Sequence, residues 1–144
     1  MRVLVQRVLN AKCTVDGNVT GEVEKGYLLF VGYTHTDTKE TNLKAIKKVL
    51  NLRIFEDECG KMNLNINQVN GKILSISQFT LYANSKDGNR PSFTDCLKPD
   101  MANELYLHFN EELKKHISVE SGIFQADMKI SLVNDGPCTI LLEF

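Results

Sequence analysis

Residues Leu74–Pro91 read LSISQFTLYANSKDGNRP, and the fold of the chain can be worked out from this stretch. It predicts a β-strand over residues 72–79 followed by a polar loop. Because successive side chains of a strand alternate between its two faces, one face should be aliphatic and packed, and the other should become polar toward Ser77. Two hydroxyls, an amide and an aromatic ring follow one another in Ser77-Gln78-Phe79-Thr80, where the strand passes into a turn. That placement suits a functional site better than a core.

The residues near Ser77 do not match the pattern of a serine activated by a neighbouring base, as in serine proteases. No Gly-x-Ser-x-Gly elbow surrounds this residue, and no histidine is close to it along the chain. If chemistry occurs here, hydroxyls and backbone N–H groups are expected to position and polarise a substrate, as in an oxyanion hole. The ordinary alternative is a sheet in which Ser and Thr hydroxyls pair with neighbouring strands.

The length and charge of the chain limit the kinds of partner it can have. At 144 residues it has the length of one domain, and we expect residues 1–144 to fold together. It carries 17 Lys and Arg against 18 Asp and Glu, so its net charge is −1 and no chain-wide basic field can gather phosphates. A nucleic-acid partner would therefore be held at a small local feature. The lysines between residues 39 and 48 indicate a solvated helix face.

The cysteines and the apolar runs favour a reduced, cytoplasmic protein without a cofactor. Four cysteines are isolated along the chain, with no Cys-x-x-Cys pair, so neither a zinc site nor a disulfide scaffold is predicted. The spacing of the three histidines does not match a metal-binding motif. No apolar stretch approaches the 18 residues that a membrane-spanning helix needs, so we expect no membrane association.

The first part of the chain predicts a meander of strands followed by a helix. Strands are expected at residues 2–8, 11–15, 18–23 and 27–32. Asp16-Gly17 predicts a hairpin turn because Gly tolerates the positive φ that such turns require. Asp37 and Glu40 match a capping box, and apolar residues then recur at helical spacing, so an amphipathic helix is predicted over residues 38–51.

The remaining residues add strands and one more helix. Short strands are expected at residues 53–55 and 62–66, and a long loop at residues 82–93. A second helix begins near Pro99, with a buried stripe of Ala102, Leu105, Tyr106, Phe109 and Leu113. Strands at 123–133 and 138–143 flank a turn at Asn134–Pro137. Together these elements predict an α+β domain with a curved, barrel-like, antiparallel or mixed sheet and two helices packed outside it.

Several segments closely resemble the D-aminoacyl-tRNA deacylases, long called D-tyrosyl-tRNA deacylases. The strongest are Ser77–Leu81, Gly88–Phe93 and Asn134–Thr139. Further similar segments occur in the same order along the chain: Arg2-Val3, Gln6–Val8, Asp16-Gly17, Leu52–Asp57 and Lys61–Leu64. The resemblance therefore covers the whole chain rather than one motif.

The resemblance implies a homodimer with its active sites at the subunit interface. Ser77–Thr80 would form one wall of the pocket for the aminoacylated terminal adenosine of tRNA, and Gly136-Pro137 of the partner, with a cis bond, would form the other. Arg7 would hold the Gly-Pro segment, since a guanidinium can donate to two carbonyls at once. Two residues depart from the family pattern: Gln125 stands where Gly is expected, and Cys138 stands where Val is more usual. Cys138 is close enough to a small hydrophobic residue to be neutral.

The implied reaction is hydrolysis of D-aminoacyl-tRNA to the free D-amino acid and tRNA. The carbonyls of a cis Gly136-Pro137 only accept hydrogen bonds, so they can take the α-ammonium of one enantiomer and leave no room for the side chain of the other. L-aminoacyl-tRNA should therefore be rejected, whereas glycyl-tRNA should be accepted. Phe79 would also line the substrate pocket.

In this mechanism Ser77 and Gln78 position the substrate, and main-chain N–H groups near Phe79 and Thr80 stabilise the oxyanion. Thr80 is a candidate nucleophile in the family, but no base stands near it in the sequence. We therefore favour direct attack by water, assisted by the ribose 2′-OH. Two alternatives remain: an enzyme of the same fold that edits a different aminoacyl ester, and a non-catalytic nucleic-acid-binding module.

Overall fold

The computed structural model describes residues 1–86 and 88–144, and contains a mixed sheet, a small hairpin and two α-helices. The elements, in chain order, are β1 (Arg2–Val15), β2 (Asn18–Val23), β3 (Gly26–Gly32), α1 (Lys39–Asn51), β4 (Phe55–Glu56), β5 (Met62–Leu64), β6 (Lys72–Ser77), the 3₁₀ turn η1 (Phe79–Tyr82), α2 (Pro99–Lys114), β7 (Val119–Ser121) and β8 (Lys129–Glu143). The main sheet has the order β2-β1-β3-β6-β7, and β8 pairs with β1. This arrangement confirms the predicted α+β class with two helices.

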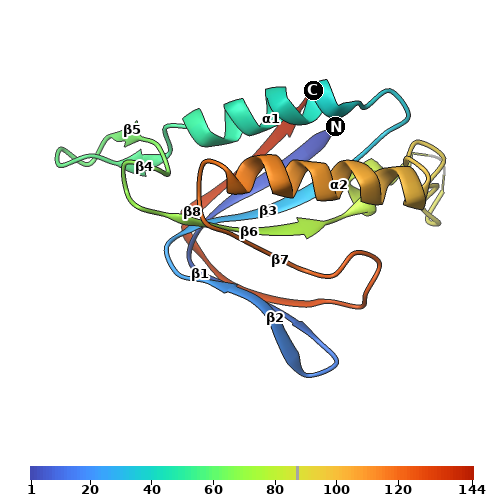
Figure 1. Ribbon diagram of the computed structural model, residues 1–144, viewed down its shortest axis with the longest axis horizontal. Helices are drawn as coiled ribbons and strands as arrows, with labels where there is room; N and C mark the ends of the chain where they lie inside the picture. Colours follow the sequence, from blue (N-terminus) through green and yellow to red (C-terminus); the bar gives the residue numbers. More distant parts are fainter. Residues whose placement is uncertain (87) are drawn as a thin grey trace.

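Strand direction divides the sheet into two parts. β1 runs antiparallel to β2, β3 and β8, whereas β6 runs parallel to both β3 and β7. The parallel strands β3 and β6 therefore end at the same edge of the sheet, which lies near the start of α2 (Figure 1). The small β4–β5 hairpin extends from the opposite end (Figure 1).

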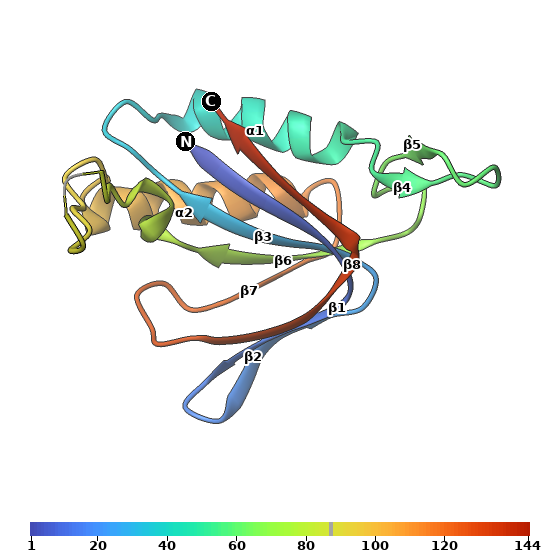
Figure 2. The same ribbon diagram turned by 180° about the vertical axis from the view of Figure 1, so that it is seen from behind.

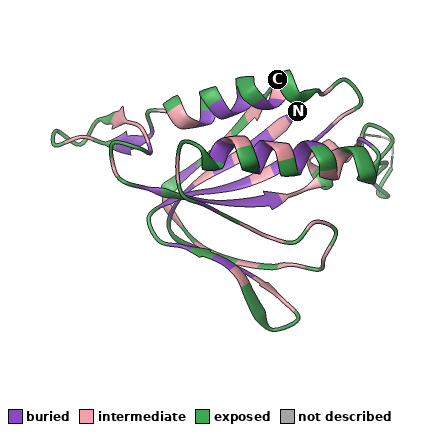
Figure 3. Cartoon of the chain, in the orientation of Figure 1, coloured by how far each residue is buried: buried purple, intermediate pink, exposed green. Residues whose placement is uncertain are grey.

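The larger of two hydrophobic cores fills the space between the sheet and the helices. Val3 and Val5 of β1 and Leu29 of β3 pack there against Val49 of α1 and Phe109 of α2, each no more than 1% exposed. Both helices bury the face that meets the sheet and expose the other (Figure 3). The stripe predicted for the second helix lies in this core, with Ala102 only partly buried.

A second core lies on the other face of the sheet and curls it toward a barrel. Val23 of β2 packs there with Leu74 and Ile76 of β6, although β1 and β3 separate these strands in the sheet order. The long strands β1 and β8 bend together beneath the rest of the sheet (Figure 2). Between Ile73 and Ile76 β6 is consequently buried on both faces, and Ser77 at its end is half-buried.

Two predicted breaks in strands are instead irregularities within continuous strands. β1 runs unbroken through Leu9 and Asn10, and β8 runs unbroken through the predicted turn Asn134–Pro137. The register between these strands shifts between Gln6 and Val8 and again between Val8 and Asn10. The shifts let the paired strands bend without ending, as β-bulges do.

One smaller prediction, about the residues that cap the first helix, also needs correction. α1 is capped by Thr38 and Thr41 rather than by the predicted Asp37–Glu40 box, because the Asp37 carboxylate pairs with the α-ammonium of Met1 at 2.6 Å. The predicted loop at residues 82–93 is present, with one bridge between Asn84 and Ser92; its residue Asp87 lies outside the described residues. In the described part of the chain, neither helix is long and apolar enough to cross a membrane.

Candidate active site

A cleft of about 690 Å³ opens at the edge where the parallel strands end. Each of β3, β6 and β7 is followed by a segment that lines it, so the cleft occupies the carboxyl-end crevice that binds ligands in many sheets with parallel strands. The start of α2 and the loop before it close the remaining side. The lining residues are Val31–Tyr33, Ile76–Phe79, Phe93, Cys96–Pro99, Ala102, Phe124–Met128 and Ile130.

The wall formed by Ser77-Gln78-Phe79 is produced by the way β6 ends. The Gln78 N–H donates to Val31 O at 2.8 Å, and the chain then turns into η1. The first hydrogen bond of this turn is donated by Leu81 N–H to Gln78 O at 3.4 Å. The amide hydrogens of Phe79 and Thr80 precede that donor and are not used inside the turn. They are therefore free of hydrogen bonds within the turn, and their predicted role in an oxyanion hole stays a prediction.

Close packing against β3 holds this turn in place. A Cβ atom added to Gly32 would lie 2.7 Å from Gln78 O, so only glycine allows the turn to approach so closely. Arg2, from β1, donates through Nη1 to Leu81 O at 2.7 Å, and its guanidinium lies 4.6 Å from the centre of the Tyr82 ring. Burial raises the pKa of Tyr82 to about 12. Arg2 thus fixes the far end of η1, a role that the sequence did not reveal.

The polar side chains of the predicted motif lie at the rim of the cleft. Gln78 Nε2 donates to Thr80 Oγ1 at 2.5 Å, and Thr80 is exposed and lies outside the lining residues. The Phe79 ring meets Phe93 edge to face at 5.1 Å, although 57% of Phe79 is exposed. Cys96 Sγ donates to Phe79 O at 3.3 Å. A large exposed aromatic surface beside free amide donors is typical of a binding site rather than of a core.

The cleft is mainly apolar and offers few groups that could act as an acid or base. Its charged lining residues are Lys98 and Asp127, and Asp127 is paired with Lys129 at 2.8 Å. No histidine or glutamate is among the lining residues of the described chain. Burial, with a smaller effect from Asp95, raises the pKa of the Cys96 thiol, which disfavours its thiolate. Within residues 1–86 and 88–144, no group of three or more side chains is arranged to hold a metal ion.

The other predicted site residues, Arg7, Gly136 and Pro137, lie together on β1 and β8. Arg7 is only 4% exposed and donates to Ile54 O at 2.6 Å and to Asp135 O at 3.2 Å, so its guanidinium does bind two carbonyls. Arg7 Nε also lies 3.0 Å from the Asp135 carboxylate. The Gly136–Pro137 bond is cis, as the resemblance implied, and both residues are exposed.

Residues Asn134–Cys138 form a bulge in β8 where its register with β1 shifts. The conformation of this bulge depends on a glycine and on one amide side chain. Gly136 has φ of +113°, and an added Cβ would lie 2.8 Å from Arg7 Nη2. Asn134 Nδ2 donates to Arg7 O at 2.9 Å and to Cys138 O at 3.0 Å, bridging β1 and both ends of the bulge. Cys138 is buried in the larger core, which agrees with its prediction as a small hydrophobic residue.

Strand register places these two groups of residues far apart within one chain. Ser77 aligns through Val31 and Val3 with Leu142 of β8. Pro137 precedes Leu142 by five residues, roughly 16 Å at 3.3 Å per residue, and three strand spacings of about 4.8 Å separate β6 from β8. The chain therefore does not bring its own Gly136–Pro137 to its own Ser77–Thr80.

Several cleft residues were not predicted from the sequence. Cys96 and Lys98 come from the loop before α2 and belong to no motif, and Phe93 ends the family-like segment Gly88–Phe93, to which no pocket role was assigned. The segment Phe124–Met128 was marked only by Gln125, where Gly is expected. Gln125 has φ of +62°, in the left-handed region that glycine prefers, which explains why Gly is usual there.

Comparisons with known proteins match the chain to one family and to solved structures of the same fold. The family model described as D-Tyr-tRNA(Tyr) deacylase matches residues 4–143. A solved structure named c-Myc DNA Unwinding Element Binding Protein is 36% identical, with a TM-score of 0.95 over 100% of this chain and 99% of that chain. Another, named as a probable eukaryotic D-amino acid tRNA deacylase, is 16% identical, with a TM-score of 0.84 over 98% of this chain and 97% of that one.

Proposed function

The chain belongs to the D-Tyr-tRNA(Tyr) deacylase family and is a D-aminoacyl-tRNA deacylase, and we propose that residues 1–144 act as one domain whose cleft binds the aminoacylated 3′ end of tRNA. The reaction is hydrolysis of the ester between a D-amino acid and the terminal ribose. We further propose that glycyl-tRNA is a substrate and that L-aminoacyl-tRNA is rejected. The following paragraphs give the support for these finer statements.

The size and lining of the cleft suit an aminoacylated nucleoside. A volume of about 690 Å³ lies within the range of small-ligand sites. Phe79, Phe93 and Phe124 provide aromatic surface for a base or a side chain, and the Phe79 and Thr80 amides can donate hydrogen bonds at the ester. Lys98 is the one positively charged residue among the described lining residues, and we propose that it pairs with a phosphate of the tRNA end.

The observation that carries the proposal is the separation of the two groups of site residues in one chain. Gly136 and Pro137 are exposed, and Arg7 and Asn134 hold their main chain, yet they lie well outside their own cleft. A second copy, related by two-fold symmetry, could place its Gly136–Pro137 against the cleft of the first. In such a homodimer each active site takes one wall from each subunit.

An apolar row on the sheet supports a second copy as the occupant of this face. Leu141, Leu4 and Phe30 align across β8, β1 and β3 and lead to Ile76 in the cleft wall. Leu141 is 49% exposed, and Leu4 and Phe30 are half-buried. Because this row is continuous with the cleft, a partner that covers it also reaches the active site.

Hydrolysis by this site needs no enzyme nucleophile. A water oxygen attacks the ester carbonyl carbon while the Phe79 and Thr80 amides hold the developing oxyanion, and each such donor contributes about 10²–10³ in rate. The bond to the ribose 3′ oxygen then breaks, and the proton lost by the water passes to that oxygen with help from the 2′-OH. Ser77 and Gln78 position the ester, and Gln78 also holds the Thr80 hydroxyl as a donor at 2.5 Å. Among the described lining residues the one carboxylate, Asp127, pairs with Lys129 at 2.8 Å rather than with Thr80, which favours this route over an acyl-Thr80 intermediate.

Discrimination between enantiomers would come from the partner's main chain. Carbonyl groups of Gly136 and Pro137 accept the α-ammonium of a D-amino acid and leave no space for a side chain on the opposite face. Glycine has no side chain to exclude, so the same pocket accepts it. The pocket then recognises the backbone of the amino acid rather than its side chain.

The direct test compares hydrolysis of D-tyrosyl-, glycyl- and L-tyrosyl-tRNA by the purified protein. We expect the first two to be hydrolysed and the third to be resistant. Rapid hydrolysis of L-tyrosyl-tRNA would refute chiral rejection, and failure with every D-aminoacyl-tRNA tested would refute the proposed substrate class.

A mixing experiment tests whether subunits share a site. Two inactive variants, one altered at Gln78 and one at Gly136, are mixed and allowed to exchange subunits. With shared sites, half of the dimers become mixed and half of their sites are intact, so about a quarter of the wild-type activity returns. No recovery after verified exchange would show that each site is built within one chain.

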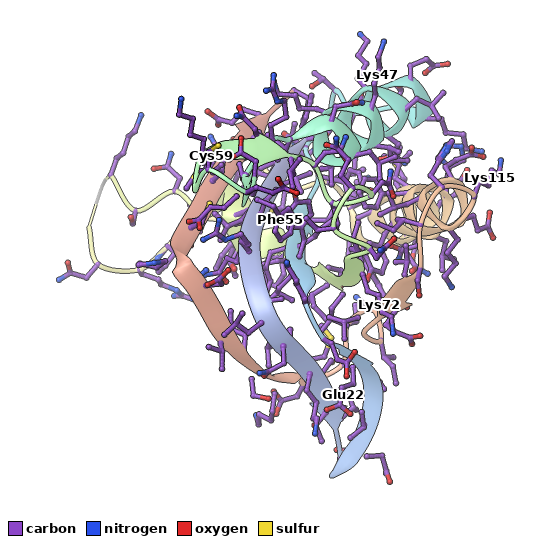
Figure 4. All side chains as sticks on the ribbon, turned by 90° about the vertical axis from the view of Figure 1, so that its left-hand side faces the viewer. Glu22, Lys47, Phe55, Cys59, Lys72 and Lys115 are labelled. Atoms are coloured by element: carbon purple, nitrogen blue, oxygen red, sulfur yellow. The ribbon has the colours of Figure 1, made fainter. Side chains whose placement is uncertain are left out.

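Duplex DNA binding is the second candidate, because one similar structure is named for binding a DNA unwinding element. The charge distribution argues against it as the main function: Lys47, Lys72 and Lys115 are spread over α1, β6 and the end of α2, and Glu22 lies on the β2 arm (Figure 4). A gel shift with duplex DNA, repeated at increasing salt, separates the two functions, since phosphate-driven binding weakens steeply with salt.

A further inference from the structure

Tyr106 reaches from α2 to the end of β6, directly behind the cleft wall. Its side chain is 2% exposed, and its hydroxyl donates to Ser75 O at 2.7 Å. Ser75 O also accepts the Gly122 N–H at 3.1 Å. The Tyr106 ring lies 6.1 Å from the ring of Phe124, which lines the cleft. Tyr106 itself is not a lining residue, so it can act on the site only through its neighbours.

The contact falls where β6 loses its neighbour on one side. The pairing of β6 with β7 stops at Ser75 and Ser121, whereas its pairing with β3 continues to Ser77. Two further residues of β6 therefore lack a partner strand on the β7 side in the described structure. The Tyr106 hydroxyl is the group from α2 that meets the strand at this point.

Polar atoms gather around this hydroxyl in an otherwise apolar layer. Burial raises the pKa of Tyr106, and the neighbouring polar groups of Ser75, Asn110 and the Ser77 main chain partly oppose this shift. Ser75 Oγ and Asn110 Oδ1 are buried and have no well-formed hydrogen bond to a described residue. Three polar side chains here, where aliphatic ones would pack, indicate a requirement other than stability.

We propose that Tyr106 is a positioning residue for deacylation, which fixes the end of β6 and thereby the direction of the Phe79 and Thr80 amides. The proposal rests on the function proposed above. The amides follow Ser77 by only two and three residues, and Ser77 follows the Ser75 carbonyl that Tyr106 holds by two residues. A small displacement of Ser77 would turn both donors away from the oxyanion, whose stabilisation requires close alignment.

The test variant is Tyr106→Phe, which keeps the ring and removes only the hydroxyl. Ser75 O retains the Gly122 N–H, so the variant should fold. We expect kcat for D-tyrosyl-tRNA to fall about tenfold and KM to change less than twofold, because substrate contacts are intact. The matched control is Tyr27→Phe, whose hydroxyl donates to Leu52 O at 3.3 Å and whose ring is fully buried. Both variants should lower Tm by a few degrees, but in Tyr27→Phe kcat should stay within twofold of the wild-type value.

Hydrogen exchange of the free protein tests the positioning without any substrate. We expect the hydrogen-bonded amides of this strand end, Gln78 N–H to Val31 O and Leu81 N–H to Gln78 O, to exchange at least tenfold faster in Tyr106→Phe than in Tyr27→Phe. If the wild-type protein hydrolyses no D-aminoacyl-tRNA, the proposed function fails, but this exchange result still decides whether Tyr106 holds the strand end. Unchanged exchange, or an equal loss of kcat in both variants, would overturn the proposal.

Discussion

The end of β6 and the bulge of β8 are built in different ways. At the end of β6, Gln78 and Thr80 bind each other at the rim, and the amides of Phe79 and Thr80 are unused within the turn. At the bulge, Arg7 donates to Asp135 O and to Ile54 O, and Asn134 donates to Cys138 O and to Arg7 O. The main chain on both sides of Gly136–Pro137 is therefore held by hydrogen bonds.

The difference fits the two tasks that we propose for these regions. A group that stabilises an oxyanion must be available, so its hydrogen bonds cannot be used by the protein itself. A group that excludes one enantiomer must instead resist displacement by the substrate, so its main chain is held from behind. The two regions lie at opposite ends of the sheet (Figures 1 and 2), and the proposed homodimer brings one of each together.

The largest effect should come from Arg7→Ala. The change removes a buried guanidinium and leaves Ile54 O and the Asp135 carboxylate without their partner. We expect the free energy of unfolding to fall by about 2–4 kcal/mol, measured by urea denaturation. The matched control is Lys12→Ala, which removes a surface pair with Glu22 at 2.9 Å and should cost less than about 1 kcal/mol. Equal losses in the two variants would mean that the bulge is not held by Arg7.

Gly136→Ala should have the next largest effect. Its φ of +113° is unfavourable for alanine, and the new Cβ would press on Arg7 Nη2. We expect a loss of about 1–3 kcal/mol in stability, together with loss of discrimination between D- and L-tyrosyl-tRNA. Gly17→Ala is a suitable control, since φ is +80° there but an added Cβ meets nothing within 4 Å. Retained discrimination in a destabilised Gly136→Ala protein would separate the bulge from selectivity.

The parts of the fold that sequence predicted are those set by local periodicity. The apolar stripe of the second helix, which includes Leu105 and Phe109, recurs at helical spacing, whereas β3 is a continuous apolar run. The structure buries both, as expected. The errors fall at Leu9-Asn10 and Asn134–Pro137, which have the composition of turns. Their conformation is set by pairing between β1 and β8, strands more than a hundred residues apart, and no local pattern reports such a pairing.

The site was predicted in a similarly uneven way. Ser77–Thr80 could be found because polar residues at the end of an apolar strand are unusual, and Gly136–Pro137 came only from the family resemblance. Phe93 and Lys98 reach the cleft from the loop before α2 and Phe124 from the loop between β7 and β8, so their roles depend on tertiary folding. Tyr106 was predicted correctly as a core residue, but its hydrogen bond to Ser75 O depends on how α2 crosses the sheet.

Thr80→Ala should lower the rate of hydrolysis much less than the loss of a catalytic nucleophile would. The hydroxyl is exposed at the rim and accepts a hydrogen bond from Gln78, whereas the Thr80 amide is unaffected by the change. We expect single-turnover hydrolysis of D-tyrosyl-tRNA to fall only a few-fold, and Thr20→Ala, a threonine on β2, to have no effect. Complete loss of activity in a folded Thr80→Ala protein would instead identify its hydroxyl as the nucleophile.

Gln125→Gly should have the smallest effect and should increase stability. Gln125 occupies a left-handed conformation with φ of +62° in the cleft wall, where a side chain costs energy that glycine avoids. Because glycine also loses more entropy on folding, we expect a net gain of only about 0.5–1 kcal/mol in urea denaturation. Asn70→Gly, at φ of +52° and outside the cleft lining, is the control and should gain less, since asparagine tolerates this conformation. A change in KM for D-tyrosyl-tRNA confined to Gln125→Gly would show that this side chain contacts the bound tRNA end. A loss of stability would show that contacts of the Gln125 side chain stabilise the cleft wall by more than its left-handed backbone conformation costs.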